Sequence, residues 1–155
     1  ISREYVCIFF IIGKAIKKVS EWNGDKTKIF TYTTIEVTTN VKGVTETDTI
    51  TIKEAGGVVG DAGMRVDGIA DFKTGEESVI FLIKHGQHYM TVGMMQGKYS
   101  IVLDPKSGKK IVHPSTSRKV KFMNANGKEA SLPDKQGAET TLDDFLLEIK
   151  SHLKK

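Results

Sequence analysis

The fold class is decided by one run of residues, Lys28-Ile29-Phe30-Thr31-Tyr32-Thr33-Thr34-Ile35-Glu36-Val37-Thr38-Thr39. Apolar and aromatic residues alternate with threonines in this run, and alternation of β-branched and aromatic residues is typical of a β-strand. Phe30 and Tyr32 share one phase of the alternation, whereas Ile35 and Val37 share the other. We therefore predict a long strand with a β-bulge near its middle, where the phase changes.

Five more runs of strand length flank this segment, at residues 6–12, 47–53, 78–83, 88–95 and 98–103. In the second of these runs, Ile50 and Ile52 are expected to face the core. The runs are separated by dipeptides that favour tight turns, namely Asn23-Gly24, Gln96-Gly97, Ser107-Gly108 and Asn126-Gly127. Strands joined by such short turns pair as antiparallel neighbours, so we predict an antiparallel sheet.

One helix is predicted, at the C-terminal end of the sequence. Five apolar residues form a single stripe at helical spacing: Leu142, Phe145, Leu146, Ile149 and Leu153. Thr140 or Thr141 is expected to cap the helix, because a threonine side chain can accept a hydrogen bond from a free N–H of the first turn. The fold class is therefore mainly β, a small antiparallel β-barrel or sandwich with a C-terminal amphipathic helix.

Length and composition indicate one globular domain. The chain has 155 residues, 39% of them hydrophobic and 27% charged, which is ordinary for a single domain. Its single cysteine, Cys7, excludes an internal disulfide framework and a zinc site made of several cysteines. The densest apolar run, residues 6–12, is far shorter than the about 20 residues that a membrane-spanning helix needs, so no membrane span is expected.

No motif of a known catalytic site is present, and we predict a protein that is not an enzyme and uses no cofactor or metal. Cys7 lies inside an apolar run, where a thiol behaves as a small hydrophobic group. The acidic pair Glu76-Glu77 is expected to be a solvated turn, since adjacent carboxylates point apart. The segment His85-Gly86-Gln87-His88 is expected to be a hairpin turn with exposed histidines.

The glycine-rich segment Ala55–Gly63 is the strongest candidate for a contact surface. Its spacing, G-G-x-x-G-x-x-G, differs from both the dinucleotide fingerprint and the Walker loop, so a surface loop or a corner of the barrel is predicted. Trp22, beside its own turn, is either an aromatic anchor for a partner or simply packed on the barrel. The candidate residues for binding a protein or a glycan are Trp22, Gly56, Gly57, Asp61 and Arg65.

The formal net charge of +4 is confined to the C-terminal third. Residues 1–103 carry twelve Lys or Arg and twelve Asp or Glu, whereas residues 104–155 carry eleven and seven. Two basic hairpins are predicted within 106–128, and they form the candidate polyanion site, Lys106, Lys109, Lys110, Arg118, Lys119 and Lys121. Nucleic acid is disfavoured as a partner, because Phe122 is the only aromatic residue there for base stacking. The alternative is that these lysines protect a sheet edge from aggregation.

Several segments in order resemble a known pattern. They are Ile12-Gly13-Lys14-Ala15, Glu21-Trp22-Asn23-Gly24-Asp25, Val41-Lys42-Gly43, Gly56-Gly57, the run 72–82 and the run 92–99. This order resembles a family of bacterial secreted or envelope proteins, and it is similar to the netrin-like domain shared with the tissue inhibitors of metalloproteinases. The resemblance covers residues 4–103 and implies an OB-type barrel. It also implies export, to the periplasm, the cell envelope or the medium.

Two departures limit what this resemblance implies about function. Netrin-like domains are braced by disulfides, whereas this chain has only Cys7, and inhibition in that family uses an N-terminal cysteine where this sequence has Ile1. A protease-inhibitor role thus rests on fold analogy alone. The leading expectation is a non-enzymatic binding module, with residues 1–103 as an OB-like barrel core. Residues 104–155 would add the basic hairpins and the helix, packed on the same domain.

Overall fold

The computed structural model describes residues 8–93, 97–114 and 140–153 of the chain. Its first five strands are β1 (Ile8–Trp22), β2 (Ile29–Lys42), β3 (Thr49–Ala55), β4 (Gly57–Val59) and β5 (Ala62–Met64). The next five strands are β6 (Glu77–His85), β7 (His88–Thr91), β8 (Lys98–Leu103), β9 (Lys110–Pro114) and β10 (Thr140–Thr141), and the helix α1 (Leu142–Leu153) follows. The prediction of a mainly β fold with one C-terminal helix is confirmed.

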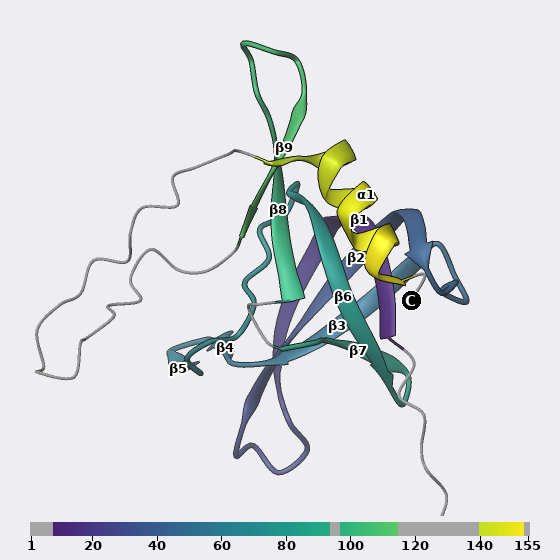
Figure 1. Ribbon diagram of the computed structural model, residues 1–155. Coiled ribbons are helices and arrows are strands. Elements are labelled where there is room, and N and C mark those ends of the chain that lie inside the picture. The colour runs from purple at the N-terminus through teal and green to yellow at the C-terminus, as the bar shows by residue number, and fades with distance from the viewer. Residues whose placement is uncertain (1–7, 94–96, 115–139, 154–155) are drawn as a thin grey trace, which may run out of the picture.

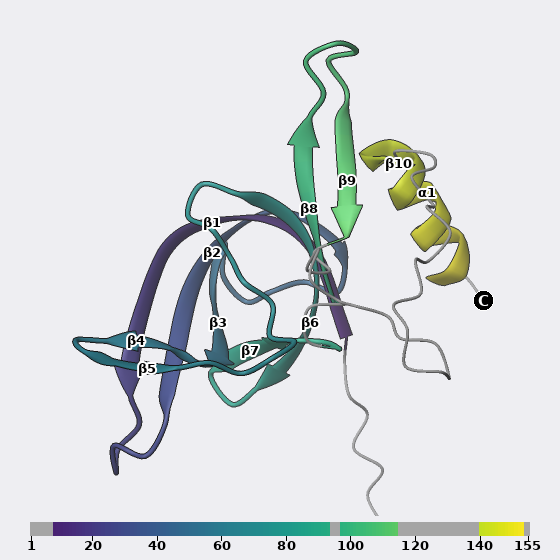
Figure 2. The same cartoon turned by 90° about the vertical axis from the view of Figure 1, so that its left-hand side faces the viewer.

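Strand pairing forms a ring of five strands (Figures 1 and 2). β1 pairs with β2 along one edge and with β6 along the other, in both cases antiparallel. β2 pairs with β3, and β6 pairs with β7. The ring is completed between β3 and β7 by a single parallel residue pair, Ile52 with Tyr89. The seam between β3 and β7 is therefore the place where the ring has the least backbone pairing.

The long strand β2 is confirmed, but the predicted phase change is wrong. Its buried residues keep one phase through Ile29, Thr31, Thr33 and Ile35, and its pairing with β3 has no irregularity between residues 30 and 36. The ladder between β1 and β2 does contain bulges, but the extra residue nearest the predicted position is Ile16 of β1. The large aromatic side chains did not indicate the buried face of β2, because the smaller Thr31 and Thr33 are the buried residues.

Phe30 and Tyr32 lie on the opposite, outer face of β2 and are only half-buried. The ammonium group of Lys53, from the neighbouring strand β3, lies 4.5 Å from the centre of the Phe30 ring and 5.8 Å from that of Tyr32. The His88 ring meets the edge of Tyr32 with 5.4 Å between ring centres. These side chains cover each other on the outside of the sheet, which explains how the aromatic residues are accommodated outside the core.

The helix packs on the outer side of β6 and β8, and four residues of its predicted apolar stripe face inward. Leu142, Phe145, Leu146 and Ile149 contact a cluster built on Phe10, Ile12 and Val79. The centres of the Tyr99 and Phe145 rings lie 4.9 Å apart. The cap is Thr141, whose Oγ1 accepts a hydrogen bond from the Asp144 N–H at 3.2 Å. The helix and the β4–β5 hairpin lie on opposite sides of the ring (Figure 2).

Most predicted turns are observed, and two local interpretations change. The turns at Asn23-Gly24, Gly86 and Gly108 join β1 to β2, β6 to β7 and β8 to β9. Gln96 of the predicted Gln96-Gly97 turn and the whole predicted turn at Asn126-Gly127 lie outside the described residues. The glycine-rich segment is a two-stranded hairpin, β4–β5, rather than an irregular loop. His85 is exposed as predicted, but His88 is half-buried against Tyr32.

The proposed division between residues 103 and 104 coincides with the turn between β8 and β9, which pair with each other. β8 also pairs with β6, so the hairpin continues the sheet of the ring rather than starting a separate one. Within the described ranges, no helix has both the length and the apolar character to cross a membrane.

Candidate functional site

A cleft of about 1450 Å³ lies at the side of the ring that carries the β4–β5 hairpin. The polar side chains of its floor come from three neighbouring strands, with Lys18 and Ser20 on β1, Thr31 and Thr33 on β2, and Glu54 on β3. Its other walls come from the hairpin and from the segment 63–73 that returns across the ring. Residues of the hairpin and of that segment are therefore brought against a floor that is fixed by the sheet.

The most informative residue of the floor is Glu54, which the sequence analysis missed. Ile50 and Ile52 face the core as predicted, and Glu54 continues the same phase of β3 with 8% of its surface exposed. A carboxylate in the inward phase of a strand is unusual, because burial of a charge is unfavourable unless it is paired. The sequence contained this signal, since Glu54 follows the two inward isoleucines at the spacing of two residues.

Among the residues that the structure describes, Glu54 has one hydrogen-bond partner and no counter-ion. Its Oε1 accepts a hydrogen bond from the Thr91 backbone N–H at 3.1 Å. Burial raises the pKa of the Glu54 carboxyl above its ordinary value, and its interactions with the Thr91 side chain and backbone N–H only partly offset this effect. No lysine, arginine or histidine of the described residues lies within 4.0 Å of the Glu54 carboxylate.

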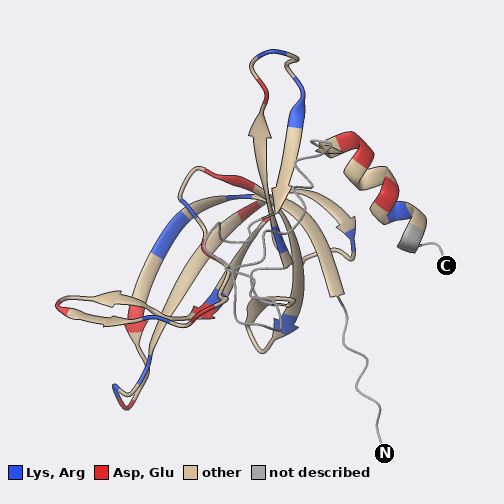
Figure 3. Cartoon of the chain, turned by 60° about the vertical axis from the view of Figure 1, so that its left-hand side comes forward, with Lys and Arg blue, Asp and Glu red and all other residues tan. Residues whose placement is uncertain are grey.

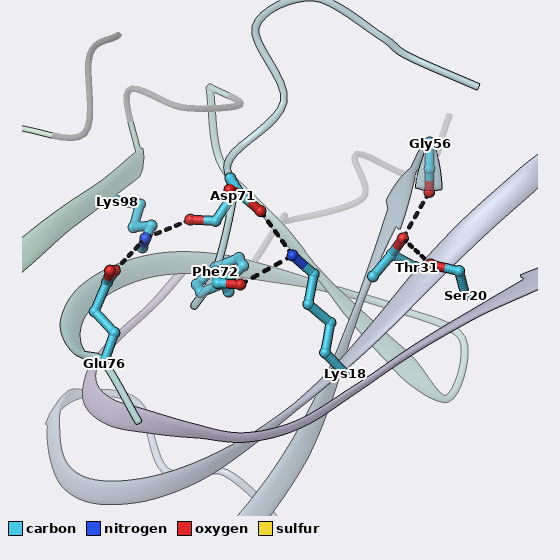
Figure 4. A network of polar contacts seen from close by, with 8 residues as sticks. All are labelled: Lys18, Ser20, Thr31, Gly56, Asp71, Phe72, Glu76 and Lys98. Carbon is cyan, nitrogen blue, oxygen red and sulfur yellow. Dashed lines mark hydrogen bonds and ion pairs between the residues drawn. The ribbon is translucent and has the colours of Figure 1, made fainter. Parts of the chain in front are cut away.

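The hydroxyl groups of Ser20 and Thr31 fix the start of the β4–β5 hairpin (Figure 4). The Ser20 and Thr31 hydroxyls lie 2.8 Å apart, and Thr31 Oγ1 donates to the Gly56 carbonyl at 2.6 Å. Gly57 passes so close that a Cβ atom on it would lie 2.5 Å from both hydroxyl oxygens, and its φ is +138°. Only glycine fits this crossing, so Gly57 shapes the cleft without offering a side chain to a ligand.

Two lysines hold the far wall of the cleft (Figure 4). Lys18 Nζ donates to the Asp71 carboxylate at 2.7 Å and to the Phe72 carbonyl at 3.0 Å. Lys98 is 3% exposed, and its ammonium group binds the Asp71 carbonyl and the Glu76 carboxylate. Both lysines are thus occupied by the protein, and together they tie segment 71–76 to β1 and β8.

The expectation that Glu76 and Glu77 form a solvated turn is wrong. Glu76 Oε1 accepts hydrogen bonds from the Ser78 and Ser100 hydroxyls at 3.2 Å each, besides its ion pair with Lys98. Glu77 pairs with Lys110 of β9 at 2.9 Å. The two carboxylates do point apart, but each points to a lysine that tertiary structure brings in from β8 or β9.

The structure brings three of the five predicted contact residues to the cleft. Gly56, Gly57 and Arg65 line it. Arg65 belongs to the solvated rim, because its Nε lies 3.8 Å from Asp67 Oδ1 and both side chains are almost fully exposed. Asp61 is exposed in the turn between β4 and β5, and Trp22, 38% exposed at the end of β1, does not line the cleft.

The described part of the predicted polyanion site carries its own acidic groups (Figure 3). Lys106 and Lys109 are exposed in the β8–β9 turn. The Asp104 carboxylate accepts hydrogen bonds from the Lys106 N–H at 3.0 Å and the Ser107 hydroxyl at 2.8 Å, which hold the pKa of that carboxyl below its ordinary value. Lys110 is paired with Glu77. Arg118, Lys119 and Lys121 lie outside the described residues.

Among the residues that the structure describes, no group of three or more His, Cys, Asp or Glu side chains could hold a metal ion. Comparisons of the chain with protein-family models, with curated proteins and with solved structures found no match. We therefore infer a function from the chemistry of the cleft residues.

Proposed function

We propose that this chain is a non-enzymatic binding module on an OB-like barrel, and that its ligand occupies the cleft beside the β4–β5 hairpin. The order of pairing supports the OB-like architecture. Five strands pair in the order β1-β2-β3-β7-β6 and return to β1, and an OB-fold is a five-stranded, partly open barrel. The sparse pairing between β3 and β7 corresponds to the open part.

The observation that carries the proposal is the buried carboxylate of Glu54 on the floor of the cleft. Ligand sites typically combine apolar walls with a few fixed polar groups. Here Val58, Val66 and Ile69 supply apolar surface on the walls, and Glu54 with its neighbouring hydroxyls supplies the polar floor. Val58 is 68% exposed in the hairpin, so apolar surface is available there to a ligand.

Binding is proposed rather than catalysis because the charged groups of the cleft are not arranged as an acid–base pair. Catalysis by a paired general acid and general base needs two titratable groups within reach of the same substrate. The Lys18 ammonium is held by Asp71, and the Lys98 ammonium is enclosed with Glu76. Glu54 is thus left as a single recognition group.

The experiment compares two glycine-to-tryptophan variants on peptide and glycan arrays. Gly63 lines the cleft, and a Cβ on it would have no neighbour closer than 3.8 Å, so Gly63→Trp obstructs the cleft without a backbone clash. Gly24 lies in the β1–β2 turn with nothing within 4 Å of its Cβ position, so Gly24→Trp is the matched control.

We expect wild type and Gly24→Trp to bind the same array members, with Gly63→Trp weaker by about tenfold or more. The amide resonances of residues 54–58 and 63–73 should shift when a bound member is added to labelled protein. Binding that Gly63→Trp leaves unchanged, or the absence of any member that shifts these resonances, would refute the cleft as the binding site.

A further inference from the structure

The charged side chains that line the cleft are exposed to solvent, and most of them are paired, whereas Glu54 is buried. Lys18 is matched by Asp71, and Arg65 faces Asp67 at the rim. Lys73 is exposed, so water solvates its ammonium group. Glu54 differs from all of these, because it is buried and none of the described residues neutralises it.

One carboxylate oxygen of Glu54 is held and the other is available. Oε1 accepts the Thr91 N–H, and Oε2 has no hydrogen bond from any described residue. Among the described residues, Thr91 Oγ1 is the one fully enclosed side-chain polar atom without a partner, so Oε2 of Glu54 is not fully enclosed. The space beside the Glu54 side chain is the cleft that it lines. The hydrogen bond from the Thr91 N–H also fixes the direction of the carboxylate, and the register of β2 and β3 places it on the same face as Thr31.

The surroundings of this free oxygen select a positively charged donor. The Thr31 and Thr33 side chains stand beside Glu54 on the same face, and both are buried. An anionic ligand would be repelled by the carboxylate, and a neutral ligand without a donor would leave it unpaired at a cost of about 1–3 kcal/mol. An ammonium group has three N–H donors and a guanidinium group has five, so either could bind the carboxylate and a hydroxyl together.

We propose that the cleft binds an organic cation, a primary ammonium or guanidinium group, and that Glu54 is its counter-ion. This inference rests on the proposed binding function and names its ligand class. The apolar side chains of Val58, Met64 and Val66 on the walls suit the aliphatic stem that carries such a group in lysine and arginine.

The cation could belong to a free small molecule or to a basic side chain of a peptide. The cleft, at about 1450 Å³, is larger than the roughly 300–1000 Å³ of typical small-molecule pockets. A peptide that presents one arginine or lysine would fill more of it. Both sources share the chemistry that Glu54 recognises, and the experiment therefore includes both.

The experiment measures dissociation constants by titration of labelled protein with matched probes. N-acetyl-arginine methylamide is compared with its neutral isostere N-acetyl-citrulline methylamide, and with N-acetyl-glutamate methylamide as the anion. The second arm uses an alanine-rich hexapeptide with one central arginine or citrulline. Each probe is tested on wild type, on Glu54→Gln and on the control Glu46→Gln, whose carboxylate is exposed and pairs with Lys84 outside this cleft.

In wild type we expect the arginine probe to bind about tenfold or more tightly than the citrulline probe, with the glutamate probe weakest. The preference should fall to within about twofold in Glu54→Gln and persist in Glu46→Gln. A larger affinity for the hexapeptide than for the amino-acid amide identifies a peptide as the source of the cation. The arginine-to-citrulline comparison in wild type needs no variant to fold.

Equal binding of arginine and citrulline probes by wild type would overturn the inference, and so would a preference that survives in Glu54→Gln. In either case the proposed binding function stands if Gly63→Trp still weakens array binding. If no cationic probe binds but neutral glycans or peptides bind in the cleft, the proposed ligand class is wrong and the cleft remains the binding site. If nothing shifts the cleft resonances, both proposals fail.

Discussion

The Glu54 carboxylate accepts a hydrogen bond from the Thr91 backbone N–H at 3.1 Å, beside the single residue pair that joins β3 to β7. Backbone pairing between these two strands consists of Ile52 and Tyr89 alone. The side chain of Glu54 thus provides a second link across the seam of the ring. The same carboxylate lines the cleft, so the closure of the ring and the chemistry of the candidate site depend on one group.

Glu54→Gln is expected to stabilise the protein at neutral pH. Burial raises the pKa of the Glu54 carboxyl above its ordinary 4.5 in the folded state, so the unfolded chain loses this proton first as the pH rises. The folded state therefore loses stability between pH 4.5 and the raised pKa, and the penalty is constant above it. Glutamine keeps an acceptor for the Thr91 N–H and carries no charge.

Thermal unfolding of both proteins from pH 4 to pH 8 measures this effect. The gain in Tm from Glu54→Gln should grow with pH through this window and then level off. The ionisable groups that share the cleft, Lys18, Arg65, Asp67, Asp71 and Lys73, are unchanged in both proteins. Glu46→Gln is the opposite control, because the hydrogen bond from Lys84 lowers the pKa of the Glu46 carboxyl. A gain that shrinks as pH rises would contradict the assignment.

The strands and the helix were predictable because their signals are local. The alternation of Ile50 and Ile52 and the stripe of Leu142, Phe145 and Leu146 depend only on spacing within one element, and both face as predicted. The phase of β2 was not predictable in this way. Whether Phe30 or Thr31 is buried depends on what the other strands place against each face, and Lys53 covers Phe30 from β3.

The cleft was only half predictable for a related reason. The glycine-rich segment marked one wall, but the floor is assembled from three strands whose contributing residues are far apart in sequence. The Lys98–Glu76 pair illustrates this: Glu76 looks like a turn residue until β8 pairs with β6 and places Lys98 beside it. Glu54 could have been found, since its place in the inward phase of β3 is visible in the sequence.

Lys98→Met is expected to destabilise the fold strongly. Lys98 is 3% exposed and its ammonium group binds both the Glu76 carboxylate and the Asp71 carbonyl. Its loss leaves the largely buried Glu76 carboxylate unbalanced, which should lower the free energy of unfolding by about 3 kcal/mol in urea titrations.

The matched control for Lys98→Met is Lys110→Met. Lys110 pairs with Glu77 at 2.9 Å, but its side chain is 51% exposed. A surface pair of this kind contributes about 0–1 kcal/mol, so the two lysines should differ by about 2 kcal/mol or more. Equal losses from the two substitutions would show that burial of the Lys98 pair is not what ties segment 71–76 to the ring.

Thr31→Val is expected to destabilise the protein. Thr31 Oγ1 bonds both the Ser20 hydroxyl and the Gly56 carbonyl, so the substitution should lower the free energy of unfolding by about 1–3 kcal/mol. Urea unfolding checks this, and an unchanged free energy of unfolding would show that these two bonds do not hold the start of the hairpin.

Gly57→Ala is expected to disturb both stability and the cleft. The methyl group would lie 2.5 Å from the Ser20 and Thr31 oxygens at a φ of +138°, so the hairpin must move and the free energy of unfolding should fall by more than about 2 kcal/mol. Gly60→Ala separates the two causes. Its φ is +58° with open space around it, so it bears only the conformational penalty of about 1–2 kcal/mol.

NMR spectra of Gly57→Ala and Gly60→Ala give a second test, because amide resonances report the position of the hairpin. Gly57→Ala should shift the amide resonances of Ser20 and Thr31, because the new methyl group displaces their hydroxyls, whereas Gly60→Ala should leave them unchanged. If Gly57→Ala is as stable as Gly60→Ala and leaves both resonances in place, the close crossing of β4 over β1 and β2 does not exist. The hairpin would then not form a wall of the cleft in the position described.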